Sequence, residues 1–187
     1  MKSQDIVILL KIVSLQERDK QGAISDPQSL SEAIDPYSVR GLEASLGISK
    51  TEVSASLKRS VDSALAIKSG RYPKPNRRNL YEFIAHGLKY AFPAKPGAPQ
   101  RGIPTAFAAP MLKGELISAG EDIYVWPYAN GKSKGLAVEP LFKSVPEAAL
   151  RDERLYEYLA LIDASRLGNQ RESNLARAKL EEGLLRA

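Results

Sequence analysis

The sequence predicts an α+β fold, and three observations lead to that class. Apolar residues recur at helical spacing near both ends of the chain, in residues 4–16 and 145–184. Residues 93–110 hold five of the twelve prolines, which is too many for a helix. Two short segments, residues 123–128 and 135–139, bracket the turn sequence N-G-K-S-K-G and predict a hairpin. We therefore expect helices at both ends and a proline-rich, β-hairpin middle.

The N-terminal part is expected to form short helices. The first covers residues 4–16, where apolar side chains fall on one face. A second is expected over residues 29–34, with Asp26 as its cap, and it ends before Pro36 because the residue before a proline avoids helical backbone. A third is expected over residues 37–46.

Composition excludes several classes of protein. With 43% hydrophobic and 26% charged residues, the chain has the composition of a globular protein. It has no cysteine, which excludes disulfides, thiolate zinc sites and cysteine nucleophiles and fits a cytoplasmic protein. Asp5 and Lys11 interrupt the N-terminal apolar run, so we expect neither a signal peptide nor a membrane-spanning helix.

The stretch L-G-I-S-K-T-E-V-S-A-S-L-K-R at residues 46–59 predicts a helix-turn-helix. Gly47 ends the first helix because glycine adopts left-handed backbone without steric cost. Ser49 and Glu52 have the spacing of a capping box, in which each side chain bonds a backbone amide of the other. The apolar positions that would form the seam between the two helices are Leu42, Leu46, Ile48, Val53 and Leu57.

The second of these helices, at about residues 49–64, is the expected recognition helix. Lysine contacts guanine or phosphate, and threonine and alanine contact the thymine methyl group. The distribution of charge supports this interpretation. Residues 47–101 hold eleven Lys or Arg and three acidic residues, whereas the rest of the chain holds sixteen Lys or Arg and nineteen acidic residues. The candidate DNA-binding residues on this helix are Ser49, Lys50, Thr51, Ser54, Ala55, Lys58 and Arg59. The alternative is a helical corner with a solvated lysine face.

Two basic segments are candidates for a β-wing that grips phosphate, and the sequence leaves the choice open. The first follows a short strand expected at residues 65–68 and contributes the candidates Arg71, Lys74, Arg77 and Arg78. As an alternative, Arg77 and Arg78 begin a helix that is capped by Asn76, and they pair with Glu82. The second segment lies between extended pieces expected at residues 89–92 and 101–107, and contributes Lys95 and Arg101.

Residues 46–65 resemble the helix-turn-helix of bacterial winged-helix regulators, those of the MarR type in particular. Their common form is L-G-x-S-x-x-x-V-S-x-x-L-x-x-L-x-x-x-G-L, which is matched at Leu46, Gly47, Ser49, Val53, Ser54, Leu57 and Leu65. The second leucine of this form falls at Ser60, one position before the apolar Val61, and Ala64 replaces the usual glycine before the wing. The resemblance implies a winged helix-turn-helix fold and a DNA-binding function.

The wider chain resembles a group of uncharacterised bacterial proteins. They share N-R-R-x-L-x-E-F-x-x-H-G, R-G-x-P-T-A, V-W-P and S-V-P-E-A-A-L-R-D, all of which are present here. This resemblance implies a DNA-binding regulator and names neither an operator nor a ligand.

Signals for catalysis are weak, and we expect no catalytic residue, metal or cofactor. His86 is the single histidine, so a multi-histidine metal site is excluded, and we expect a partly buried structural residue. No phosphate-binding glycine loop is present. Trp126, Tyr124 and Tyr128 alternate along an expected strand, where core or interface packing is favoured over an effector-binding wall.

We therefore expect a winged helix-turn-helix domain at residues 1–110 and a β-hairpin and helical extension at residues 111–187. The expected function is regulation of transcription by sequence-specific binding of double-stranded DNA. A homodimer is expected because such proteins read paired half-sites, and the helices from Tyr156 to Leu184 are the candidates for its seam.

Two other functions fit the same residues. One is an antitoxin or defence-operon component that binds a partner protein through its C-terminal half and regulates its own gene. The other is a protein-interaction module whose basic face meets an acidic partner, without any duplex preference.

Overall fold

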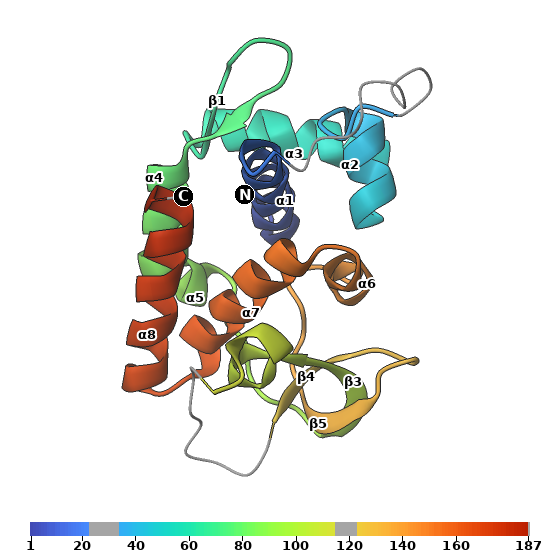
Figure 1. The fold of residues 1–187 in the computed structure, drawn as a ribbon, viewed down its shortest axis with the longest axis vertical. Helices are drawn as coiled ribbons and strands as arrows, with labels where there is room; N and C mark the ends of the chain where they lie inside the picture. Colours follow the sequence, from blue (N-terminus) through green and yellow to red (C-terminus); the bar gives the residue numbers. More distant parts are fainter. Residues whose placement is uncertain (23–33, 115–122, 187) are drawn as a thin grey trace.

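The computed structural model describes residues 1–22, 34–114 and 123–186, and it confirms a mixed α+β protein (Figure 1). The N-terminal elements are α1 (Ser3–Lys20), α2 (Val39–Leu46), α3 (Lys50–Asp62), β1 (Ala66–Ile67) and β2 (Lys74–Pro75). The C-terminal helices are α6 (Val145–Leu150), α7 (Glu153–Leu167) and α8 (Gln170–Glu181), followed by the π-helical turn η5 (Glu182–Arg186). Within the described ranges, no helix combines the length and apolar character needed to cross a membrane.

Helix α1 is the central helix among the N-terminal elements. The predicted helix at residues 4–16 is confirmed and extends to Lys20. One buried face was expected, but every residue from Gln4 to Leu15 is buried, because α3 packs on one side of the helix and α7 on another. The hydrophobic core that the described residues form therefore includes both the N-terminal and the C-terminal helices.

Helices α2 and α3 form the predicted corner. The side chain of Ser38 caps α2 by accepting a hydrogen bond from the Gly41 backbone N–H at 3.0 Å. Gly47 ends α2 with φ at 64°, in the left-handed region. The seam residues are buried as expected: Leu42, Leu46, Ile48, Val53 and Leu57.

The predicted capping box at the start of α3 is wrong. The Ser49 side chain caps no backbone amide. Instead, Glu43 of α2 accepts a hydrogen bond from the Lys50 backbone N–H at 3.1 Å. Glu52 turns away and pairs with Lys2 and Arg59. The cap therefore comes from the neighbouring helix, which a local spacing pattern does not reveal.

Helix α3 ends in a tight backbone motif that starts a hairpin. Ala64 adopts φ of 58°, a conformation that favours glycine. The Leu65 backbone N–H bonds the carbonyl of Ser60, and the Ala64 N–H bonds that of Val61, which together make a Schellman motif. The antiparallel pair β1–β2 follows directly, so the expected strand at residues 65–68 is confirmed.

The hairpin leads into a helical segment in three parts. These are α4 (Arg77–Glu82), the π-helical turn η2 (Phe83–Gly87) and α5 (Leu88–Ala91). Asn76 caps α4, as expected, by accepting from the Asn79 backbone N–H. The extended piece predicted at residues 89–92 is wrong, because Leu88 is buried on the core side and α5 continues the helix. His86 is exposed rather than partly buried.

The middle of the chain forms a small closed barrel. Its strands are β3 (Pro99–Thr105), β4 (Tyr124–Pro127) and β5 (Ser133–Ala137). The predicted β4–β5 hairpin is wrong, because these strands pair in parallel and each also pairs antiparallel with β3. Glycine permits this closure: a Cβ at Gly102 would lie 2.0 Å from the Trp126 carbonyl oxygen.

The barrel is fixed to α7 through a buried carboxylate. Asp163 accepts hydrogen bonds from the Trp126 indole Nε1 at 2.6 Å and from Thr105 Oγ1 at 2.8 Å. Trp126 is buried, so the core reading of this residue is confirmed. Since β3 belongs to residues 1–110 and its partner strands to residues 111–187, the barrel spans the boundary that we predicted between domains.

The expected C-terminal helices are present and separated at Gly168. Their apolar stripes are largely buried inside this chain, at Tyr156, Leu159, Ile162 and Leu180 among others. Leu175 and Leu185 are the large apolar side chains of α8 and η5 that remain exposed in the described part of the chain. The dimer seam stays a prediction. The short helix predicted at residues 29–34, with its cap Asp26, lies outside the described residues except for Ile34.

Candidate nucleic-acid interface

The outer face of α3 carries the candidates expected to read DNA. Ser49, Lys50, Thr51, Ser54 and Lys58 are exposed, and Ala55 is half-buried among them. Within the described ranges, no side-chain hydrogen bond or ion pair engages these residues. Helical spacing puts Lys50, Ser54 and Lys58 on adjacent turns of one face. The face is therefore available to a ligand as a continuous polar and cationic strip.

The basic connection between β1 and β2 lies next to α3, at one end of the molecule (Figure 1). Lys68 and Arg71 are exposed on it, and Lys74 is exposed at the start of β2. Arg71 is only loosely engaged, because its side chain is 80% exposed and lies 3.8 Å from Asp35. A pocket of about 670 Å³ separates this connection from α1, with Ile12, Tyr72 and Lys74 among its lining residues. The hairpin thus places further exposed cations beside α3.

Arg59 lies on the opposite side of α3 and points inward. It makes a bidentate pair with the fully buried Asp5 of α1, with its Nε at 3.0 Å and Nη2 at 2.7 Å from the carboxylate oxygens. Burial by itself raises the pKa of Asp5, but hydrogen bonds from Arg59 and from the Lys2 backbone outweigh it, so the pKa is lowered. Arg59 therefore fixes α3 on α1, and its guanidinium is occupied.

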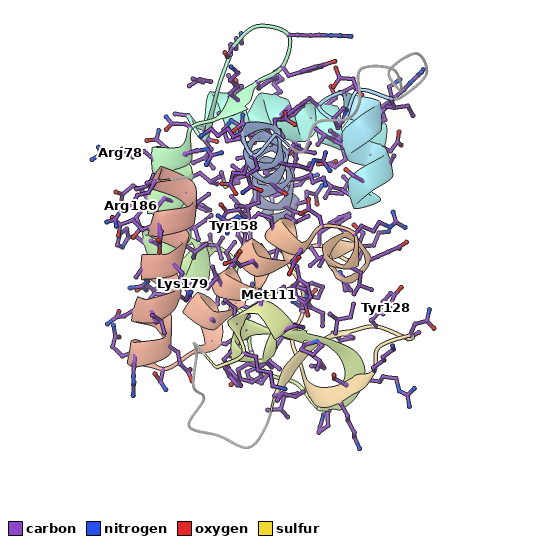
Figure 2. The ribbon with its side chains drawn as sticks, viewed as in Figure 1. Arg78, Met111, Tyr128, Tyr158, Lys179 and Arg186 are labelled. Atoms are coloured by element: carbon purple, nitrogen blue, oxygen red, sulfur yellow. The ribbon has the colours of Figure 1, made fainter. Side chains whose placement is uncertain are left out.

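Arg77 forms an ion pair in the interior of the protein, whereas Arg78 is exposed at the surface. The Arg77 Nη1 lies 3.0 Å from the buried carboxylate of Glu17, which also accepts from Arg154 at 2.6 Å and from the Tyr158 hydroxyl at 2.7 Å. These residues join α1, α4 and α7 in the middle of the molecule, where Figure 2 shows Tyr158. Arg78 is exposed and faces outward (Figure 2). The expected helix start at these arginines is confirmed, although the carboxylate partner is Glu17 rather than Glu82.

Lys95 and Arg101 do not join the other candidates. Arg101 lies on β3 and Lys95 lies in the segment before it, and both are exposed. Figure 1 places the barrel at the opposite end of the long axis from α3 and the β1–β2 hairpin. Of the two basic segments, the β1–β2 connection is therefore the one that adjoins α3.

The sequence reading missed the buried carboxylates that hold this arrangement together. Asp5 and Glu17 fix the basic residues described above. The half-buried Asp152 likewise accepts hydrogen bonds from Lys11 Nζ at 2.7 Å and from Ser14 Oγ at 2.8 Å. The apolar run at residues 6–10, directly bounded by Asp5 and Lys11, was the available signal in the sequence. In the described part of the chain, no group of three or more metal-ligating side chains is close enough to hold an ion.

Comparison with known proteins returned no matching family model, no matching curated protein and no matching solved structure.

Proposed function

We propose that the protein is a sequence-specific binder of double-stranded DNA that regulates transcription. The observation that carries this proposal is the exposed face of α3, where Lys50, Ser54 and Lys58 follow a buried helical corner and make no side-chain bond within the described residues. An interior that neutralises Arg59 and Arg77 leaves the outer cations unneutralised, which favours an anionic partner.

The arrangement of elements fits a winged helix-turn-helix. In that architecture the second helix of the corner enters the major groove, and a β-hairpin directly after it contacts the neighbouring backbone. Here α3 supplies the groove helix, and the β1–β2 connection supplies Lys68, Arg71 and Lys74 for phosphate. Small side chains at Thr51, Ser54 and Ala55 permit close approach to base edges.

The start of α3 is already occupied by an acidic side chain. Backbone N–H groups in the first turn of a helix have no partner within the helix and favour anions, and the Glu43 side chain bonds the first of these groups, that of Lys50. We therefore assign the phosphate contacts of α3 to its lysine side chains and not to its backbone N–H groups. A homodimer reading two half-sites completes the proposal, because one short helix specifies few base pairs.

The test is selection of bound duplexes from random DNA, followed by sequencing, for the full chain at two salt concentrations. We expect one enriched motif with two related half-sites. The double variant Lys50→Ala/Thr51→Ala should lose the motif, whereas Lys143→Ala, an exposed lysine outside α3 and the hairpin, should retain it. Salt-sensitive binding without a motif, equal in all three proteins, would contradict sequence-specific recognition and favour a role in protein interaction.

A further inference from the structure

A row of side chains crosses the barrel at Arg101. In the antiparallel register Arg101 is directly opposite Lys134 of β5. On its other side, the Arg101 carbonyl accepts a hydrogen bond from the Tyr128 backbone N–H at 3.1 Å, which continues the register of β4 by one residue. Residues directly opposite each other in neighbouring strands point to the same face. The row therefore presents two cations and an aromatic ring together.

The pairing of Arg101 with Lys134 opposes folding. Like charges directly opposite on neighbouring strands repel, and both side chains are exposed. Neither Arg101 nor Lys134 forms an ion pair with a described residue, and the described residues between 89 and 138 carry six Lys or Arg and no Asp or Glu. With Glu115, Glu121 and Asp122, which lie outside the described residues, this segment still has a balance of +3. A surface of this kind is suited to an anion supplied by another molecule.

A shallow hollow lies against the row. Its volume is about 450 Å³, and it is lined by Gln100, Arg101, Pro127, Tyr128 and Ala129. Tyr128 is half-buried and packs partly on the core, so its ring is held in place while part of it stays accessible. Figure 2 shows Tyr128 at the barrel end of the molecule, near the projecting β4–β5 connection. An aromatic ring beside a guanidinium provides stacking and charge within one hollow.

We propose that this face of the barrel binds a single strand of nucleic acid. One base stacks on Tyr128, and successive phosphates on one side of that base lie on Arg101 and Lys134. Stacking on aromatic side chains together with a cationic track for the backbone is the usual chemistry of single-strand binding. An acidic protein would also contact the two cations and the ring. A single strand is favoured because every nucleotide supplies both a phosphate and a flat base, the two groups that this row is suited to bind. This face is separate from α3, so one protein molecule has two nucleic-acid contacts at opposite ends.

The test measures binding of a fluorescent oligothymidine of about 15 nucleotides to the full chain by polarisation. Lys134→Glu and Tyr128→Ala should each weaken binding about tenfold or more, and Tyr128→Phe should retain it. Lys113→Glu, an exposed lysine outside the row, is the charge-matched control and should change affinity little. Lys134→Glu should leave the melting temperature unchanged or raise it, because it replaces a repulsive pair with an attractive one. Loss of binding in that variant is therefore not explained by unfolding.

The two nucleic-acid proposals fail in different ways. Lys50→Ala/Thr51→Ala should lose the duplex motif and keep the oligothymidine affinity. No binding of the oligothymidine, or equal binding by wild type, Lys134→Glu and Tyr128→Ala, would overturn the barrel proposal without touching the α3 proposal. Loss of oligothymidine binding in the α3 variant alone would place the strand on α3, and this result would also overturn the barrel proposal. Weakened duplex binding with unchanged strand binding in the barrel variants would show a duplex contact instead.

Discussion

Both sides of α3 carry positively charged side chains, but only those on the inner side are paired with acidic residues in the described part of the chain. On the inner side, Arg59 is bound by the buried carboxylate of Asp5 and by Glu52. On the outer side, the side chains of Lys50 and Lys58 have no partner among the described residues. The difference shows that a count of basic residues overstates the surface available to DNA. The inner cation holds the helix in place, and the outer cations are left to meet a ligand.

Removal of the inner carboxylate should have the largest effect on stability. Asp5→Ala leaves Arg59 without its buried partner, and we expect a loss of about 2 to 3 kcal/mol in the free energy of unfolding, discounted because Arg59 is partly exposed. Urea denaturation measures this change, with Lys58→Ala as the matched variant on the outer side. Equal small changes in the two variants would contradict the distinction between the sides.

Acid should weaken the same inner contacts. The folded-state pKa values of Asp5 and Asp152 are both lowered, by hydrogen bonds that outweigh the effect of burial. A lowered folded pKa gives stability that is fully present above the unfolded value of about 4 and is lost as pH falls below it. Urea denaturation over a pH series from about 6 to about 3 should show this decline. Asp5→Asn should flatten it, and an unchanged slope in that variant would contradict the role of Asp5.

The end of α3 provides a smaller effect of the opposite sign. Ala64 holds a left-handed backbone with φ of 58°, which costs an L-residue about 1 to 2 kcal/mol. Ala64→Gly removes that cost and adds some entropy to the unfolded chain, so we expect a net gain of about 0.5 to 1 kcal/mol. Thermal and urea unfolding both measure it. A loss of stability would show that α3 does not end in the Schellman motif described above.

The smallest effect on stability is expected on the outer side of α3. Lys50→Ala/Lys58→Ala should change the free energy of unfolding by less than about 0.5 kcal/mol. The same variant should reduce the slope of log affinity against log salt by up to about 2 on the selected duplex, because each phosphate that a lysine no longer neutralises lowers the slope by about one. An unchanged slope would show that these lysines do not contact phosphate.

The local parts of the fold were predictable from the sequence. Helical spacing, Gly47 and Asn76 located the helix ends around the corner and after the hairpin, because each depends on residues a few positions apart. The exposed face of α3 followed from the same spacing. Arg59 was predicted to contact DNA, but it faces the interior. Its partner Asp5 is 54 residues away in the chain, so the spacing within α3 could not reveal this contact.

The strand pairing could not be predicted, because it depends on residues far apart in the chain. Strands β4 and β5 were located, but not their parallel arrangement, which arises because β3 pairs with both. Short strands carry too little pattern to specify a register. The separation of Arg101 from α3 has the same origin, because the barrel carries its strand to the far end of the molecule.

The most direct test of the central claim, that the outer face of α3 reads bases, is a change of specificity. Ser54→Asn places an amide on that face, and asparagine pairs with adenine through two hydrogen bonds in the major groove. In repeated selection from random duplexes, we predict that the enriched motif changes toward adenine at one position of each half-site and stays the same elsewhere. A motif identical to that of the wild type, or uniform weakening on every sequence, would contradict base reading by this helix.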